Sequence, residues 1–206
     1  MPASLRERNR ERTREELLDV GARLFRARGF SATTVTDIAE EAGIGRRTFF
    51  RYFATKEELA LAIRDEDQQL FLAHLASRPR VEGPFAALQN AMLETLAHFD
   101  GPEGDALVER LVASKAMMAA NPTIHAAHLH REAMRQEQAV RILAERLAVD
   151  PQADPRPRLW TAVVSAITEV TLAVWLTQHR AAHPIPMTGV FREMLANCGL
   201  TDPGGR

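Results

Sequence analysis

The stretch TTVTDIAEEAGIGRRTFFRYFATKEELALAI, which spans residues 33–63, decides how the N-terminal part of this chain folds. Its apolar positions recur every three or four residues, and this spacing indicates helices. Thr34 or Thr33 can cap a short helix over residues 35–42, because a threonine hydroxyl accepts a hydrogen bond from the first turn of a helix. Gly43 then opens a tight turn, since glycine adopts backbone conformations that other residues avoid. The stretch therefore predicts a helix, a turn and a second helix.

The second helix, expected over residues 46–53, has two different faces. Phe49 and Phe53 are four residues apart and share one side, which is the side that can pack in a core. The opposite side is polar and basic. Arginine can bond guanine edges, threonine can bond a base or touch a methyl group, and tyrosine can hold a phosphate, so this geometry suits the major groove of DNA. The side chains concerned are Arg47, Thr48, Arg51 and Tyr52.

The rest of the chain also shows helical spacing, and strand signals are scarce. A helix is expected over residues 10–28, and Thr55 is expected to open another that reaches about residue 75. Later breaks divide the remainder into five helices. We predict an all-α protein of about nine helices, in which a three-helix helix-turn-helix DNA-binding domain precedes a larger helical-bundle domain for ligand binding and dimerisation. The expected ranges are residues 1–55, residues 56–200 and a disordered tail over residues 201–206.

Charge is unevenly distributed along the 206 residues, although the formal net charge is only −1. Residues 1–53 hold 11 arginines against 8 acidic residues, a net +3, and this favours an N-terminal part that meets an anion. The single cysteine, Cys198, cannot form an internal disulfide. No uncharged apolar run of about 18 residues is present. We therefore expect a cytoplasmic protein that does not enter a membrane.

Residues 33–63, with the preceding REELLDVGARLFRARGF over residues 14–30, closely resemble the signature of the TetR family of repressors. This chain has Gly45 at the position where members of this family often have a serine or threonine that caps the following helix. Arg47 also stands where glycine is frequent, and it could shift the preference for an operator. The resemblance implies base or groove contacts by Arg46, Arg47, Thr48, Phe50 and Arg51, and phosphate contacts by Thr34, Tyr52 and Lys56.

A later helix, expected over residues 155–178, contains LWTAVVSAITEVTLAVWL and is apolar on every side apart from Glu169. Such a helix needs cover from its own domain and from something else. In a TetR-like protein that second cover is the same helix of another subunit, together with the final helix. The resemblance therefore implies a homodimer, and the expected interface residues are Leu172, Leu176, Val190, Phe191, Met194 and Leu195.

Several apolar side chains of the larger domain are candidates for an effector pocket, as in the family. Core packing is the competing explanation, because a methionine at helical spacing more often fills a gap in a core than contacts a ligand. The late helices are similar to those of actinobacterial TetR-family regulators with an acyl-CoA-like ligand domain, including those of mycofactocin type. We therefore expect a small apolar effector, and an acyl-CoA is the leading class. The candidates are Met92, Leu96, Phe99, Met117, Met118, Leu129, Trp160, Val163 and Ile167.

Other classes of protein receive less support from the sequence. His125 and His128 share a helix face but His130 points away from it, so neither a metal site nor a cofactor is expected. No phosphate loop, nucleophile elbow or acid and base pair indicates an enzyme. The expected function is a transcriptional repressor that binds a palindromic operator as a homodimer. The alternatives are a helical enzyme and an adaptor that binds only protein.

Overall fold

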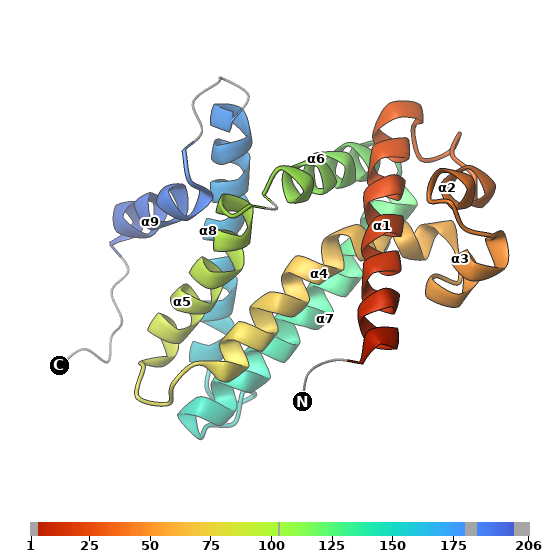
Figure 1. The fold of residues 1–206 in the computed structure, drawn as a ribbon. Coiled ribbons are helices and arrows are strands. Elements are labelled where there is room, and N and C mark those ends of the chain that lie inside the picture. The colour runs from red at the N-terminus through yellow and green to blue at the C-terminus, as the bar shows by residue number, and fades with distance from the viewer. Residues whose placement is uncertain (1–3, 103, 180–184, 200–206) are drawn as a thin grey trace. The chain divides into compact units, whose positions relative to one another are not determined.

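The computed structural model describes residues 4–102, 104–179 and 185–199, and these residues form nine α-helices, one short 3-10 helix and no strand (Figure 1). The all-α prediction is confirmed. Each predicted helix is present, and most ends lie within a few residues of the predicted ones, but the first helix begins at Leu5 and not near residue 10. The helices are α1 (Leu5–Arg28), α2 (Val35–Glu41), α3 (Arg46–Tyr52), α4 (Lys56–Ser77), α5 (Pro84–Ala97), η1 (His98–Asp100), α6 (Gly104–Ala120), α7 (Pro122–Leu147), α8 (Arg156–His179) and α9 (Met187–Cys198).

The chain forms two compact units, and each of them draws on two separate stretches of sequence. The first unit comprises Met1–Glu66 and Asp105–His130, and the second comprises Asp67–Gly104 and Arg131–Arg206. This division differs from the predicted border after residue 55, because side chains of α4, α6 and α7 complete the core around α1. The predicted disordered tail lies outside the described residues.

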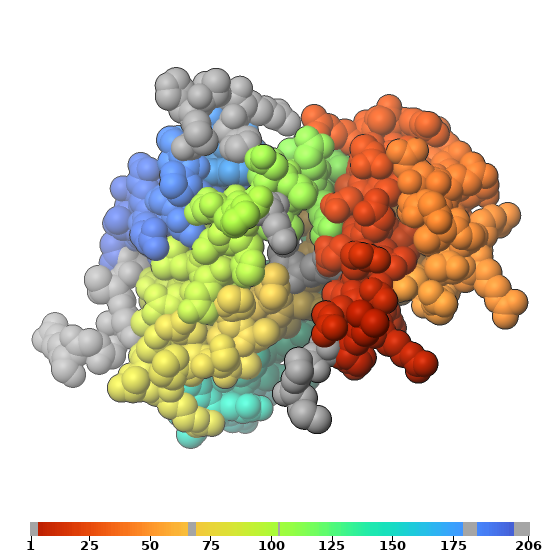
Figure 2. All heavy atoms as spheres, in the orientation of Figure 1, coloured from red at the N-terminus to blue at the C-terminus, as the bar shows by residue number. Residues whose placement is uncertain are grey.

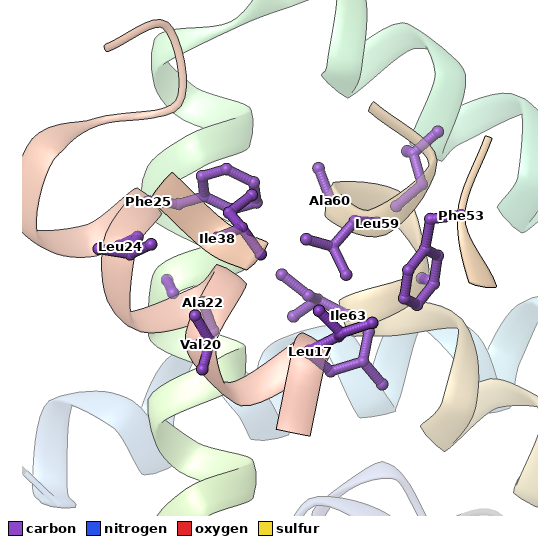
Figure 3. Close-up of a cluster of buried hydrophobic side chains, with 14 of the residues drawn as sticks. Leu17, Val20, Ala22, Leu24, Phe25, Ile38, Phe53, Leu59, Ala60 and Ile63 are labelled. Atoms are coloured by element: carbon purple, nitrogen blue, oxygen red, sulfur yellow. The ribbon is translucent and has the colours of Figure 1, made fainter. Parts of the chain in front are cut away.

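The core of the first unit gathers buried side chains from several helices (Figure 3). Leu17 of α1, Ile38 of α2 and Leu59 of α4 are fully buried in it. Burial of one such side chain contributes about 1.5–3 kcal/mol to the free energy of folding. Gly21 allows α1 and α4 to approach closely, because a Cβ at this position would lie 2.6 Å from Cδ2 of Leu59. The helices α2 and α3 therefore pack against a core that α1 and α4 share.

Side-chain caps fix the start of α2. The Thr34 hydroxyl accepts a hydrogen bond from the Asp37 amide at 3.1 Å, and the Asp37 carboxylate accepts one from the Thr34 amide at 2.7 Å. Thr33, the other candidate for this cap, is buried and donates to the Gly29 carbonyl at 2.9 Å. At the end of α2, Gly43 has a φ of +65°, so the turn into α3 uses a conformation that favours glycine.

A buried arginine joins α6 to α1 within the first unit. The Arg110 side chain is only 8% exposed, and its guanidinium lies 2.7 Å from Oδ1 of Asp19 and 2.6 Å from Oε2 of Glu15. Burial of a cation is costly unless it is paired, and these two carboxylates satisfy that need. The pairing holds α6 against α1.

In the second unit α5, α8 and α9 pack against one another. Asp100 of η1 caps the start of α9, where its carboxylate accepts hydrogen bonds from the amides of Met187 at 2.6 Å and Thr188 at 3.1 Å. Trp175 of α8 donates from its indole nitrogen to the Ile185 carbonyl at 2.7 Å. These bonds fix the beginning of α9 from two sides.

Candidate nucleic-acid interface

Helix α3 has one buried face and one open basic face. Phe49 is fully buried and anchors the helix in the core, whereas the neighbouring Phe50 is 47% exposed. Arg46, Arg47 and Arg51 are exposed, and long side chains of this orange segment extend into solvent in Figure 2. A surface hollow on this face is lined by Arg47, Thr48, Phe50 and Arg51. All five residues predicted to contact bases therefore lie on α3, and Thr48 is the only half-buried one.

The start of α3 has no side-chain cap. Gly45 occupies the N-cap position, and its carbonyl accepts the amides of Thr48 at 2.8 Å and Phe49 at 3.1 Å. These are backbone bonds that any residue could make. As expected from the departure at Gly45, the first turn of α3 gains no hydrogen bond from a hydroxyl.

The three residues predicted to contact phosphate have different surroundings. Thr34 is exposed, and its hydroxyl donates to the Asp37 carboxylate at 2.7 Å. This bond lowers the pKa of Asp37 below its ordinary value. Tyr52 is half-buried, and the Arg51 guanidinium lies 5.3 Å from its ring centroid.

Lys56 has a structural role that the sequence did not reveal. Its ammonium donates to the carbonyls of Phe30 and Thr33, both at 2.7 Å, and it lies 4.2 Å from the centroid of the Phe30 ring. Lys56 therefore ties the start of α4 to the connection between α1 and α2. An ammonium has three N–H donors, so two bonds to carbonyls leave one donor for a phosphate.

Arg14 is a second residue with a contact that the sequence did not predict. Its guanidinium lies 5.5 Å from the ring centroid of Phe53, the residue that ends α3. This contact places the N-terminal half of α1 beside the end of the candidate reading helix. The only sequence signal was the regular spacing of arginines before Leu17.

The candidate pocket residues are divided between the two units. In the second unit Leu96, Phe99 and Ile167 are buried, and Met92, Trp160 and Val163 are half-buried. In the first unit Met117 belongs to the hydrophobic core, Met118 packs against that core, and Leu129 is 55% exposed. The sequence could not assign these residues to separate units, and the pocket itself stays a prediction.

Three candidate interface residues lie inside the second unit of a single chain. Leu172, Val190 and Phe191 are between 0% and 6% exposed, so they contribute to the core of that unit and present little surface to a partner. Leu176, Met194 and Leu195 are half-buried. Because α8 is apolar all round, the sequence did not indicate that Leu172 faces the interior of its own unit. Val190 and Phe191 lie on the buried face of α9. The interface itself stays a prediction.

The exposed side of α8 carries other residues. Leu159 is 58% exposed and Val170 is 50% exposed. By length and composition alone, α8 could cross a membrane. The packing of α5 and α9 against it gives the simpler explanation, because the core helix of a folded domain has the same composition.

A short helix with an open basic face, held by a glycine turn and a capped partner helix, defines the class of helix-turn-helix DNA-binding proteins. Residues 17–63 match the family described as bacterial regulatory proteins, tetR family. The HTH-type transcriptional regulator TcmR of Streptomyces glaucescens is 36% identical over 172 residues, which are 83% of this chain and 76% of TcmR.

A further relative is also a transcriptional regulator, and a solved structure shares the fold. The putative mycofactocin biosynthesis transcriptional regulator MftR of Mycobacterium tuberculosis is 48% identical over 52 residues, 25% of this chain and 26% of MftR. The solved structure of the fatty acid degradation regulator FadR from Bacillus halodurans shares the fold, with a TM-score of 0.62 and 14% identity over 94% of this chain and 96% of FadR. The chain belongs to the TetR family of bacterial transcriptional regulators, which are not enzymes.

Proposed function

We propose that this protein is a cytoplasmic repressor that binds a palindromic operator as a homodimer and leaves it when a small apolar effector binds. The observation that carries the DNA-binding part is the open face of α3, where arginines surround the exposed Phe50 on a helix anchored by Phe49. Arginine side chains can bond guanine O6 and N7 with two hydrogen bonds each, and an exposed phenyl ring can touch a thymine methyl group.

The outer face of α8 supports the homodimer. Leu159, Ala166, Val170 and Ala173 are all exposed and recur at helical spacing, so they form one apolar stripe along the helix. Contact with the same stripe of a second subunit would remove this surface from water, as a two-fold interface does. Half-buried residues of α9, Met194 and Leu195, are candidates for the edge of this interface.

The interior of the second unit supports an apolar effector. Its candidate lining residues are aromatic or aliphatic, and the Trp160 ring lies 6.2 Å from the ring of Phe85. The hydroxyl of Thr171 is fully buried and has no hydrogen-bond partner among the described residues, so a polar group of an effector could satisfy it. An acyl-CoA combines an apolar chain with polar groups. The name of FadR, a fatty acid degradation regulator, is compatible with this class.

The test of DNA binding is a gel-shift titration with the DNA upstream of the gene. Arg47→Ala should weaken binding to the operator by about 5- to 150-fold, because one good pair of bonds to a base contributes roughly 1–3 kcal/mol. Arg80→Ala removes an exposed arginine outside α3 and serves as the matched control. Absence of binding by the wild type to both the operator and a scrambled duplex would instead favour an adaptor that binds only protein, and equal affinities for the two would contradict operator-specific binding.

The effector proposal is tested by adding acyl-CoAs of graded chain length to the complex with DNA. A coupling of about 1–3 kcal/mol between the two ligands would lower operator affinity roughly 5- to 150-fold. Val163→Trp should reduce the response to the effector while the protein still binds DNA. Absence of release at every chain length would remove the acyl-CoA proposal and leave the DNA-binding proposal intact.

A further inference from the structure

The first turns of α1 form an exposed, arginine-rich helix. Between Arg6 and Glu16 the sequence contains no apolar residue, and the first buried residue of α1 is Leu17. The helix nevertheless begins at Leu5, where the Ser4 hydroxyl and the Glu7 carboxylate form a capping box. In Figure 2 these turns form the deep red surface at the N-terminal end of the helix. Core packing does not explain this extension.

The arginines of the extension follow two opposite lines along the helix. Arg6, Arg10 and Arg14 are spaced four residues apart and share one face, whereas Arg8 and Arg12 lie on the other side. The line that ends at Arg14 adjoins α3, because the guanidinium of Arg14 lies over the ring of Phe53. Arg6 lies about 12 Å along the helix axis beyond Arg14. Phe53 is itself buried, so this contact marks the point where α1 passes the end of α3, and the exposed Arg6 and Arg10 extend positive charge from there along α1.

Like charges four residues apart destabilise an isolated helix. The line from Arg6 through Arg10 to Arg14 contains two such pairs. Glu7 and Glu11, three residues before Arg10 and Arg14, offset part of this repulsion, and Arg14 also contacts the Phe53 ring. A polyanion placed along this face would relieve the repulsion. DNA fits the position, because it meets α3 and carries a phosphate every 3.4 Å along each strand.

We infer that Arg6 and Arg10 bind phosphates of the DNA that flanks the half-site read by α3. The inference rests on the proposed function and adds a second contact surface to it. Phosphate contacts fix the register and orientation of a protein on the duplex without specifying sequence. The extension of α1 would therefore increase affinity for every operator that has enough flanking DNA.

The test compares two double variants with the same loss of charge, Arg6→Gln with Arg10→Gln, and Arg8→Gln with Arg12→Gln. Binding is measured over a range of salt concentrations on two duplexes, one that ends at the half-sites and one extended by ten base pairs on each side. The slope of log affinity against log salt should fall by about 0.9 for each phosphate that the variant no longer neutralises. Circular dichroism and thermal melting confirm that both variants are folded.

The wild type should bind the extended duplex more tightly than the short one, and the Arg6 and Arg10 variant should lose this difference and the steeper salt slope. The Arg8 and Arg12 variant should keep both. Equal effects of the two double variants would overturn the inference, because they would show a general effect of net charge. If the wild type prefers no operator over scrambled DNA, the proposed function itself fails.

Discussion

Phe49 and Phe50 show how adjacent residues of the same type take different roles on a short helix. Phe49 is fully buried and Phe50 is 47% exposed, with their ring centroids 5.5 Å apart. The exposed phenyl ring has no hydrogen-bond donor or acceptor, so it cannot bond a phosphate or a base edge. Its favourable contact in a major groove is with the methyl group of a thymine.

Phe50 should therefore make the protein sensitive to one thymine in each half-site. Replacement of that thymine by uracil removes the methyl group and keeps the base pair. We expect wild-type affinity to fall about fourfold for each methyl group removed in this way, because burial of one carbon group contributes roughly 0.8 kcal/mol to binding. Phe50→Ala should bind the thymine and uracil duplexes equally. A Phe50→Ala variant that still distinguishes the two duplexes would show that another residue reads the methyl group.

At the scale of single residues, the sequence identified the reading face but not the surroundings of its members. The spacing of Phe49 and Phe53 was sufficient to predict which side of α3 is buried. The bonds from Lys56 to two carbonyls depend on the connection between α1 and α2, which lies more than twenty residues earlier in the chain. No local pattern encodes such a contact, so only the folded structure reveals it.

At the scale of helices, local signals predicted starts and ends well. Thr34 and Thr55 cap α2 and α4 as expected, because a hydroxyl cap requires only the residues of one turn. The start of α9 differs, since its cap is Asp100, which lies 87 positions before Met187 in the chain. The sequence also could not predict which side of α8 is exposed. Its apolar residues surround the helix, and only the packing of α5 and α9 determines that Leu159 and Val170 remain exposed.

At the scale of the whole molecule, the DNA-binding surface lies in the first unit, whereas the candidate effector residues are divided between the first unit and the second. Helices α4 and α7 each run through both units, and the chain passes between the units again at the start of α6. The sequence did not predict this division, because it arises from contacts between distant stretches of the chain, such as those of Arg110 with Asp19 and Glu15, which are 91 and 95 residues away.

The central claim is that two copies of α3, held by one dimer, read two half-sites of an operator. The direct measurement is the affinity for an operator, mapped by footprinting, before and after insertion of five base pairs between the half-sites. This insertion turns one half-site by about half a helical turn, so a rigid two-fold dimer can no longer reach both. The account predicts that affinity falls to the level of a single half-site. An affinity unchanged by the insertion would contradict it.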